Sequence, residues 1–265
     1  MPAASEILHK YRAVVVTGGS SGLGHSFLSL LNTIGYSGLI CNLSRKKPVL
    51  KNAKSALKHF PCDLERFEEI EEKCKSLIDL LEKSEGPILL MNNSGFGGYG
   101  RFPAPNLEHN LSMVDLNARA PLHLTGRLLP LIEARGGALV NIASTAAFQP
   151  TPYLATYGAT KAFLLHWSLS LYADLKPKGV HVLSVCPGPT KTHFFKRAGF
   201  DQPTVSAMLS QSADAVIKET VYALKKRRSL VVTGWFNKCL VAFSGLLPKT
   251  WALRVSAYIL GKVRN

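Results

Sequence analysis

The chain has 265 residues, of which 46% are hydrophobic and 18% are charged. A chain of this length and composition forms a packed globular core and is not intrinsically disordered. Its five cysteines form no CxxC pair and no close cluster, which argues against a disulfide framework or a cysteine-rich metal site. The N-terminus lacks the apolar core of a secretory signal, and no apolar run reaches the ~18 residues that span a bilayer. We therefore expect a cytoplasmic protein without a bound metal, either soluble or peripherally attached to a membrane.

The net charge of +15 is unevenly distributed along the chain. No acidic residue follows Glu219, whereas nine basic residues do: Lys225, Lys226, Arg227, Arg228, Lys238, Lys249, Arg254, Lys262 and Arg264. A segment of this kind could meet anionic lipid, nucleic acid or an acidic partner. It could equally be a solvated basic face that aids solubility, and the sequence alone leaves that choice open. We do not expect nucleic acid as a partner.

Short apolar runs rich in Val, Ile and Leu alternate with longer segments of helical spacing. The runs are Ala13–Val16, Leu39–Leu43, Ile88–Met91, Ala138–Ile142 and Val180–Val185. Phe67–Leu81 has the apolar spacing of a helix, and Leu230–Thr233 could add an edge strand. Continuously apolar strands that alternate with helices predict a parallel sheet covered on both faces. We therefore predict a doubly wound α/β fold.

From Trp235 onward the chain is apolar and basic, and Pro248 is placed to begin a last helix through Tyr258 and Leu260. We treat residues 235–265 as a C-terminal helical extension of a single domain formed by residues 1–234. The extension could pack on that domain, cover a pocket, join subunits, or lie on a membrane surface with Trp251, Leu253 and Tyr258 inward. Internal packing is the favoured alternative, and membrane contact is the second.

A loop rich in glycine and serine follows the first apolar run, in "VVVTGGSSGLGHSFLSLL". Gly18, Gly22 and Gly24 form the pattern GxxxGxG between a strand and a helix. Glycines let the backbone approach a phosphate closely, and a helix N-terminus presents free N–H groups to it. A structural tight turn would explain the glycines as well. The absence of GK[ST] argues against a triphosphate loop, and the pattern also differs from the GxGxxG of the common dinucleotide fingerprint.

The stretch "YGATK" places Tyr157 four residues before Lys161. On a helix these side chains share one face, and an ammonium there stabilises a phenolate and lowers the pKa of the tyrosine. Reduction of a ketone creates an alkoxide, which needs a proton donor and further hydrogen-bond donors. Ser144, thirteen residues before Tyr157, offers such a hydroxyl, although it could simply close a turn after a strand.

With these motifs in view, the sequence resembles the short-chain dehydrogenase/reductase family, whose phosphate loop reads TGxxxGxG. "MNNSGFGGYG" resembles the family's NNAG, with Ser94 in place of alanine, and "VCPGPTKT" resembles its PG segment. The matches cover roughly residues 13 to 195. The resemblance implies a Rossmann-like fold of about seven strands and a catalytic set of Ser144, Tyr157, Lys161 and Asn117. Asn117 would shape a proton-relay water, or it could only tie a bent backbone to water.

The resemblance also implies that one dinucleotide runs across the carboxyl ends of the strands, with Asp63 and Leu64 at the adenine and Thr190 at the nicotinamide carboxamide. The predicted cofactor-binding residues are Gly18, Ser20, Ser21, Gly22, Leu23, Gly24, Ser44, Arg45, Asp63, Leu64, Asn93, Ser94, Gly95, Tyr157, Lys161, Pro187, Gly188, Thr190 and Thr192. About twenty residues past the loop an NAD enzyme places a carboxylate, but here "CNLSRKK" supplies Ser44 and Arg45. Because Arg pairs well with phosphate, NADP(H) is favoured over NAD(H).

We expect an NADP(H)-dependent oxidoreductase that acts on a hydrophobic ketone, aldehyde or alcohol, such as a 3-oxoacyl, steroid-like or other lipid-derived compound. Aromatic residues in the loops predict an apolar pocket: Phe96, Tyr99, Phe148, Tyr153, Phe194 and Phe195. Family resemblance suggests a homo-oligomer, either a dimer or a tetramer. The alternatives are a catalytically silent dinucleotide sensor and a membrane-surface adaptor that acts through the basic tail. The intact trio of Ser144, Tyr157 and Lys161 argues against the sensor.

Overall fold

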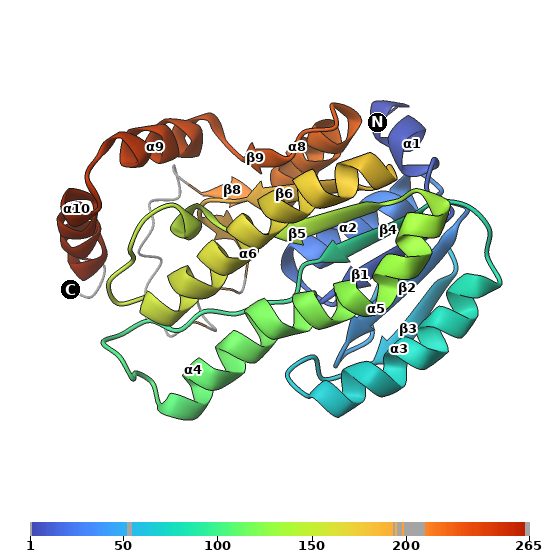
Figure 1. Ribbon diagram of the computed structural model, residues 1–265, viewed down its shortest axis with the longest axis horizontal. Helices are drawn as coiled ribbons and strands as arrows, with labels where there is room; N and C mark the ends of the chain where they lie inside the picture. Colours follow the sequence, from blue (N-terminus) through green and yellow to red (C-terminus); the bar gives the residue numbers. More distant parts are fainter. Residues whose placement is uncertain (1, 52–54, 193, 195–197, 199–209, 263–265) are drawn as a thin grey trace.

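The computed structural model describes residues 2–51, 55–192, 194, 198 and 210–262. Figure 1 shows a central sheet between two layers of helices, with a pair of C-terminal helices at one edge. The sheet has seven parallel strands in the order β3-β2-β1-β4-β5-β6-β9. Their bounds are β1 (Ala13–Thr17), β2 (Leu39–Ser44), β3 (Leu57–Pro61), β4 (Ile88–Asn92), β5 (Ala138–Ile142), β6 (His181–Cys186) and β9 (Leu230–Val232). The predicted doubly wound fold is confirmed, with β9 as its edge strand.

The strand order reverses beside β1. The chain moves outward from β1 through β2 to β3, and then returns to place β4 on the other side of β1. At such a reversal the loops that leave neighbouring strands diverge, and ligands bind in the crevice between them. A second, short sheet pairs β7 (Thr190–Lys191) with β8 (Gln211–Ser212) just past the end of β6.

Two helical layers cover the sheet. One layer consists of α1 (Pro2–Leu8), α2 (Gly22–Thr33) and α8 (Ala213–Lys225), and the other consists of α3 (Phe67–Glu82), α5 (Ala120–Arg135) and α6 (Ala155–Leu175). The helix predicted over Phe67–Leu81 is therefore α3. In the second layer α4 (Leu107–Val114) continues into α5 through a π-helical segment, Asp115–Arg119, so the three segments form one long helix (Figure 1).

The apolar strands fill two separate cores. In β1, Val14 and Val16 pack in the cluster that contains α2 and α8, whereas Ala13 and Val15 pack in the cluster that contains α3 and α5. Successive side chains of a strand point to opposite faces, so a strand that is buried on both faces must be apolar at every position. Each fully buried Val contributes roughly 1.5 to 3 kcal/mol relative to exposure. The continuous run VVV is explained by this double burial.

The C-terminal residues form two helices, α9 (Trp235–Leu246) and α10 (Lys249–Lys262). Pro248 immediately precedes α10, as the sequence predicts for the last helix. The hydroxyl of Tyr99 donates to the backbone oxygen of Leu260 at 2.6 Å, which ties α10 to the loop after β4. Among the described helices, none combines the length and apolar character required to cross a membrane.

Candidate active site

A cavity of about 1100 Å³ lies at the carboxyl ends of the strands, where the order reverses between β1 and β4. Its wall contains nearly all the predicted cofactor-binding residues: Gly18, Ser20, Ser21, Gly22, Leu23, Ser44, Arg45, Asp63, Leu64, Asn93, Ser94, Gly95, Tyr157, Lys161, Pro187, Gly188, Thr190 and Thr192. Ser144 lines the cavity as well. The fold thus brings together residues that are up to 174 positions apart, from Gly18 to Thr192.

The glycine loop is shaped by close backbone contacts. Gly18 and Gly22 have φ angles of 70° and 56°, in the left-handed region that favours glycine. Gly24 does not line the cavity; a Cβ there would lie 2.5 Å from the backbone oxygen of Gly18, so the loop has no room for a side chain. Ser21 caps α2 without a side-chain hydrogen bond in the described structure, which leaves the helix N-terminus available to an anion. This cradle fits the phosphates of a dinucleotide.

The loop after β4 is fixed against the glycine loop. The Thr17 hydroxyl accepts hydrogen bonds from the backbone N–H groups of Asn93 and Ser94 at 2.9 and 3.0 Å. The side-chain amide of Asn93 donates to the backbone oxygen of Thr17 at 2.9 Å. The Ser94 hydroxyl lies directly beside Gly18, where any Cβ would be 2.7 Å from it. These bonds hold the two loops at a fixed separation across the crevice where the strand order reverses.

The end of β2 carries the residues expected to distinguish NADP(H) from NAD(H). Arg45 is 65% exposed and lies 3.5 Å from the Glu65 carboxylate and 3.8 Å from that of Asp63. Ser44 is buried, and its hydroxyl donates to the backbone oxygen of Lys46 at 2.8 Å. In this arrangement the hydroxyl proton is not free to donate to a ligand. Lys46 and Glu65 also line the cavity. The sequence prediction missed both residues, although "SRKK" and "DLE" contain them.

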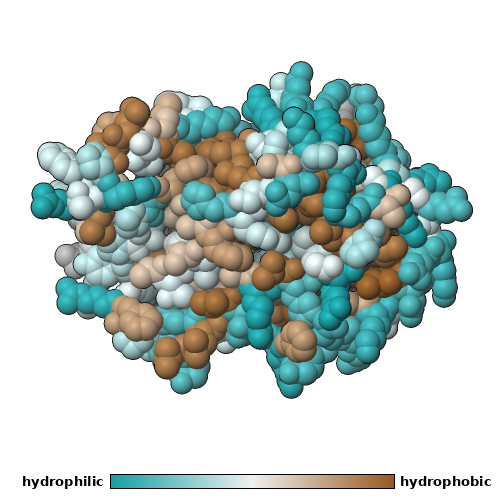
Figure 2. All heavy atoms as spheres, in the orientation of Figure 1, coloured by the Kyte–Doolittle hydropathy of each residue, from teal (hydrophilic) through white to brown (hydrophobic). Residues whose placement is uncertain are grey.

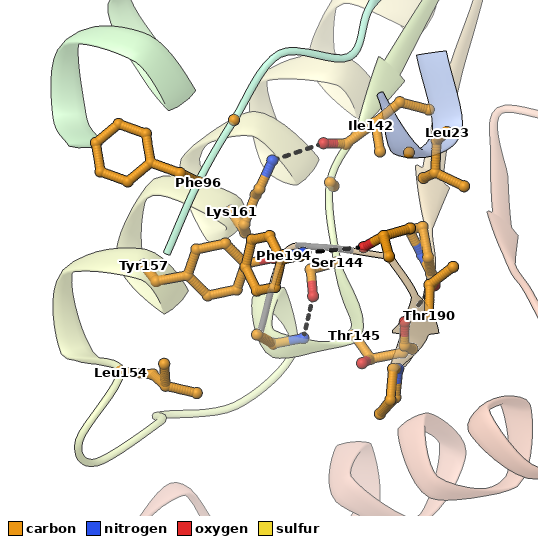
Figure 3. Close-up of a pocket in the computed structure, with 18 of the residues that line it drawn as sticks. Leu23, Phe96, Ile142, Ser144, Thr145, Leu154, Tyr157, Lys161, Thr190 and Phe194 are labelled. Atoms are coloured by element: carbon orange, nitrogen blue, oxygen red, sulfur yellow. Dashed lines mark hydrogen bonds between the residues drawn. The ribbon is translucent and has the colours of Figure 1, made fainter. Parts of the chain in front are cut away.

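Tyr157, Lys161 and Ser144 gather at one wall of the cavity (Figure 3). Tyr157 lies in the first turn of α6, and Lys161 follows one turn later on the same face. The Lys161 amine lies 5.9 Å from the centre of the Tyr157 ring and donates to the backbone oxygen of Ile142 at 2.8 Å. The Ser144 hydroxyl accepts from the Ala146 N–H at 3.1 Å and so caps a short 3-10 turn.

Burial is the main cause of the pKa shifts of Tyr157 and Lys161. It raises the pKa of Tyr157 to about 12, and a hydrogen-bonding contribution from Ser144 only partly opposes the rise. It also lowers the pKa of Lys161 to about 8. The rise comes from burial and not from the amine, which lies 5.9 Å from the ring centre, so the lowering of the Tyr157 pKa by Lys161 stays a prediction. At neutral pH the phenol keeps its proton.

Asn117 is fully buried in the π-helical segment and does not line the cavity. Its amide nitrogen donates to the backbone oxygen of Phe96 at 2.8 Å, and its oxygen accepts from the Phe96 N–H at 3.1 Å. The amide also donates to the Thr160 hydroxyl at 3.2 Å. Asn117 therefore pins the loop after β4 to α6. This contact resembles the backbone-tying alternative in the sequence interpretation, with a protein loop in place of water.

The predicted aromatic lining is only partly present. Phe96 and Phe194 line the cavity, and the Phe194 ring centre lies 5.3 Å from that of Tyr157 (Figure 3). Tyr99, Phe148 and Tyr153 are absent from the wall, and Phe195 is outside the described residues. Tyr99 and Tyr153 stack on each other 5.9 Å apart. The C-terminal helices and the residue after α9 add a mostly apolar part of the wall: Leu240, Val241, Phe243, Leu247, Ala252, Val255, Ile259 and Leu260. This part also contains the polar Asn237, Ser244 and Ser256.

A comparison with known sequences decides the family. The sequence profile described as "short chain dehydrogenase" matches residues 12–202. This chain belongs to the short-chain dehydrogenase family. The short-chain dehydrogenase is accordingly an oxidoreductase that acts on CH–OH and C=O groups and binds a nicotinamide dinucleotide.

Individual relatives agree with this assignment. An uncharacterized oxidoreductase of Staphylococcus epidermidis is 30% identical over 218 residues, which are 81% of this chain and 91% of the relative. A very-long-chain 3-oxoacyl-CoA reductase of Anas platyrhynchos is 30% identical over 72% of this chain and 64% of its own length. Among solved structures, a short-chain dehydrogenase from Sphingobium yanoikuyae in complex with NADPH has a TM-score of 0.75 at 26% identity, covering 88% of this chain and 94% of that one.

Proposed function

We propose that this short-chain dehydrogenase transfers a hydride between NADP(H) and a hydrophobic carbonyl compound or alcohol, with Tyr157 as the general acid and base. The observation that carries the proposal is the convergence of Tyr157, Lys161 and Ser144 on the cavity that also contains the glycine cradle (Figure 3). A binding protein needs the cradle alone, whereas proton transfer needs the trio.

Each member of the trio has a separate role. When bound, the dinucleotide supplies or accepts the hydride at the carbonyl carbon, and the carbonyl oxygen gains or loses a proton in the same conversion. Tyr157 donates that proton in the direction of reduction, since its high pKa keeps it protonated at neutral pH. Ser144 orients the carbonyl oxygen by donating a hydrogen bond. Lys161, held by Ile142, binds the ribose and provides positive charge beside the phenol.

The preference for NADP(H) rests on charge at the end of β2. Arg45 and Lys46 both line the cavity there, and a 2′-phosphate bound between them would compete with Asp63 and Glu65 for the guanidinium. The Sphingobium structure supports the same choice, because it is a complex with NADPH. Asp63 and Leu64 would then lie at the adenine, and Thr190 at the nicotinamide carboxamide.

A hydrophobic substrate is supported by the mostly apolar wall that α9 and α10 add to the cavity. The similarity to very-long-chain 3-oxoacyl-CoA reductases favours a ketone on a long acyl chain. We further propose that the protein acts in the cytoplasm as a homo-oligomer. Leu122 on α5 and Phe163 on α6 are 47% and 42% exposed, and such apolar side chains on neighbouring helices suit a subunit contact.

The test is to titrate the purified protein with NADPH and NADH, following nicotinamide fluorescence, and then to add hydrophobic ketones and aldehydes. Tighter binding of NADPH followed by oxidation of the cofactor is the expected result. The Tyr157→Phe variant should bind NADPH but fail to oxidise it. Failure of both nucleotides to bind would overturn the cofactor assignment, and full turnover by the variant would overturn the role of Tyr157.

A further inference from the structure

The last helix carries apolar side chains both on the cavity wall and beside it. Ala252, Val255 and Ile259 line the cavity, as expected for residues three and four positions apart on one helix face. Trp251 and Tyr258 do not line the cavity, and they are 60% and 65% exposed. Trp251 and Tyr258 are therefore exposed to bulk solvent and not to the cavity. A helix that needed only to close the cavity would carry polar residues at these outer positions.

The helix before it repeats the arrangement. Leu240 and Val241 of α9 line the cavity, whereas Trp235 and Leu246 do not line it and are 75% and 83% exposed. The side chains Trp235, Leu246, Trp251 and Tyr258 are called the outer face from here on. Together they form the most exposed group of large apolar side chains on any pair of consecutive described helices. Scattered exposed apolar residues need no explanation, but their concentration on two consecutive helices does, since Phe243 and Ile259 of the cavity wall are also 58% and 55% exposed.

Positive charge is interleaved with the outer face. Residues 235–265 contain five Lys or Arg residues and no Asp or Glu. Of these, Lys238 pairs with the Glu219 carboxylate at 3.0 Å, while Lys249 and Arg254 lie on α10 beside Trp251. Figure 2 shows brown and teal side chains mixed at the left edge of the molecule, where Figure 1 places α9 and α10. The combination of Trp, Tyr and basic residues is typical of segments that lie in the interface of a bilayer.

The positive charge of residues 235–265 also favours an anionic bilayer over a second copy of the chain as the partner. A second copy of this chain would bring an equally basic, acid-free segment against the first, and like charges across an interface oppose association. An anionic bilayer offers the opposite charge and accepts the indole and phenol rings at the depth of its headgroups. No described helix can span the bilayer, so the contact lies in its surface.

We propose that the outer face of α9 and α10 docks on an anionic lipid bilayer and that the substrate enters the cavity from the lipid. The inference rests on the proposed function, and it identifies the substrate class as carbonyl compounds dissolved in a membrane. The same two helices line the cavity and carry the outer face, and on α10 Val255 of the cavity wall lies next to Trp251 and Tyr258. A lipid substrate would enter along Val255 and Ile259, which line the cavity and are also 44% and 55% exposed.

The experiment is sedimentation of the full chain with phosphatidylserine–phosphatidylcholine vesicles and with pure phosphatidylcholine vesicles. Wild-type protein should sediment with the anionic vesicles, less so as salt rises, and the triple variant Trp235→Ser, Leu246→Ser, Trp251→Ser should bind ~10-fold or more weakly. The charge variant Arg254→Glu should lose the preference for anionic lipid. A control pair, Tyr222→Ser and Phe67→Ser, alters side chains of 53% and 45% exposure on α8 and α3 and should bind like wild type.

Activity separates this proposal from the proposed function. The triple variant should reduce a water-soluble ketone at the wild-type rate but a vesicle-dissolved ketone at least ~10-fold more slowly. Equal sedimentation of the triple variant and wild type would overturn the docking surface. A fall in the molar mass of the triple variant in solution would also overturn it, because the face would then be a contact between copies. Vesicle binding without reduction of any ketone would leave docking intact and refute the reductase.

Discussion

Replacement of Lys161 by Met tests whether the buried charge of Lys161 lowers the free energy of unfolding of the protein. Burial lowers the pKa of Lys161 from its ordinary value of 10.5 to about 8. At about 1.4 kcal/mol per pH unit, the charged side chain destabilises the folded protein by roughly 3 kcal/mol at pH 7. Met has a similar length and no charge. The hydrogen bond to Ile142, worth about 1 kcal/mol, is lost in the variant. We therefore expect Lys161→Met to be about 2 kcal/mol more stable than wild type at pH 7.

The pH dependence has a definite sign. Below pH 8 the lysine is protonated in both folded and unfolded chains, so the full penalty applies to the wild type. Between pH 8 and 10.5 the unfolded chain binds more protons at this residue, so the free energy of unfolding of the wild type rises with pH. The advantage of the variant should therefore shrink above pH 8 and vanish near pH 10. Tyr157 titrates in both proteins, and its effect cancels in the difference.

The assay is urea unfolding of the cofactor-free proteins at pH 7, 8, 9 and 10, at one protein concentration. A constant difference between the two proteins, or a variant less stable than wild type at pH 7, would refute a buried charge as the source. The variant should at the same time lose turnover, since it lacks the cation beside Tyr157. Such a gain in stability with a loss of activity is expected where a site is held in an unfavourable state.

Three further outcomes follow from the site. Tyr157→Phe should lower turnover by ~10² to 10⁴-fold while the NADPH dissociation constant stays within about twofold, measured by calorimetric titration. Gly24→Ala should destabilise the fold by ~1 to 3 kcal/mol and weaken NADPH binding, because its Cβ would meet the backbone oxygen of Gly18. The control is Gly126→Ala, whose Cβ meets no atom within 4 Å and which should stabilise the fold by about 0.5 to 1 kcal/mol. Arg45→Ala should weaken NADPH binding ~10-fold and leave NADH binding nearly unchanged; an equal loss for both would show that Arg45 does not read the 2′-phosphate.

The sequence predicts the sheet well because its strands are apolar on both faces. The runs at Ala13–Val16 and Ala138–Ile142 differ from their strands by at most one residue. The spacing of Tyr157 and Lys161 is equally informative, since a helix fixes the relative direction of residues four apart. The alternation of a strand and the repeat of a helix depend only on residues close in sequence, so they can be read from the sequence directly.

Properties that depend on distant packing could not be predicted. The pKa of Tyr157 is set by the loss of solvent, which its own segment does not determine. The partner of Asn117 is the backbone of Phe96, 21 residues earlier. The aromatic prediction failed at Tyr99 and Tyr153 because both meet α10 or each other, and the position of α10 follows from tertiary packing alone. Glu65 was missed since a charge near Arg45 in space carries no fixed spacing along the chain.

The position of α9 and α10 after the edge strand has a consequence for how substrate choice can change. Tyr157 and Lys161 lie on α6 and Ser144 follows β5, next to the packed core of the sheet. Much of the apolar wall, in contrast, comes from two short helices that follow β9, and Tyr99 ties the second of them to the loop after β4. We therefore expect substitutions of apolar wall residues on α9 and α10 to change substrate choice while Ser144, Tyr157 and Lys161 stay in place. Substrate selectivity and catalysis thus depend on different segments of this chain.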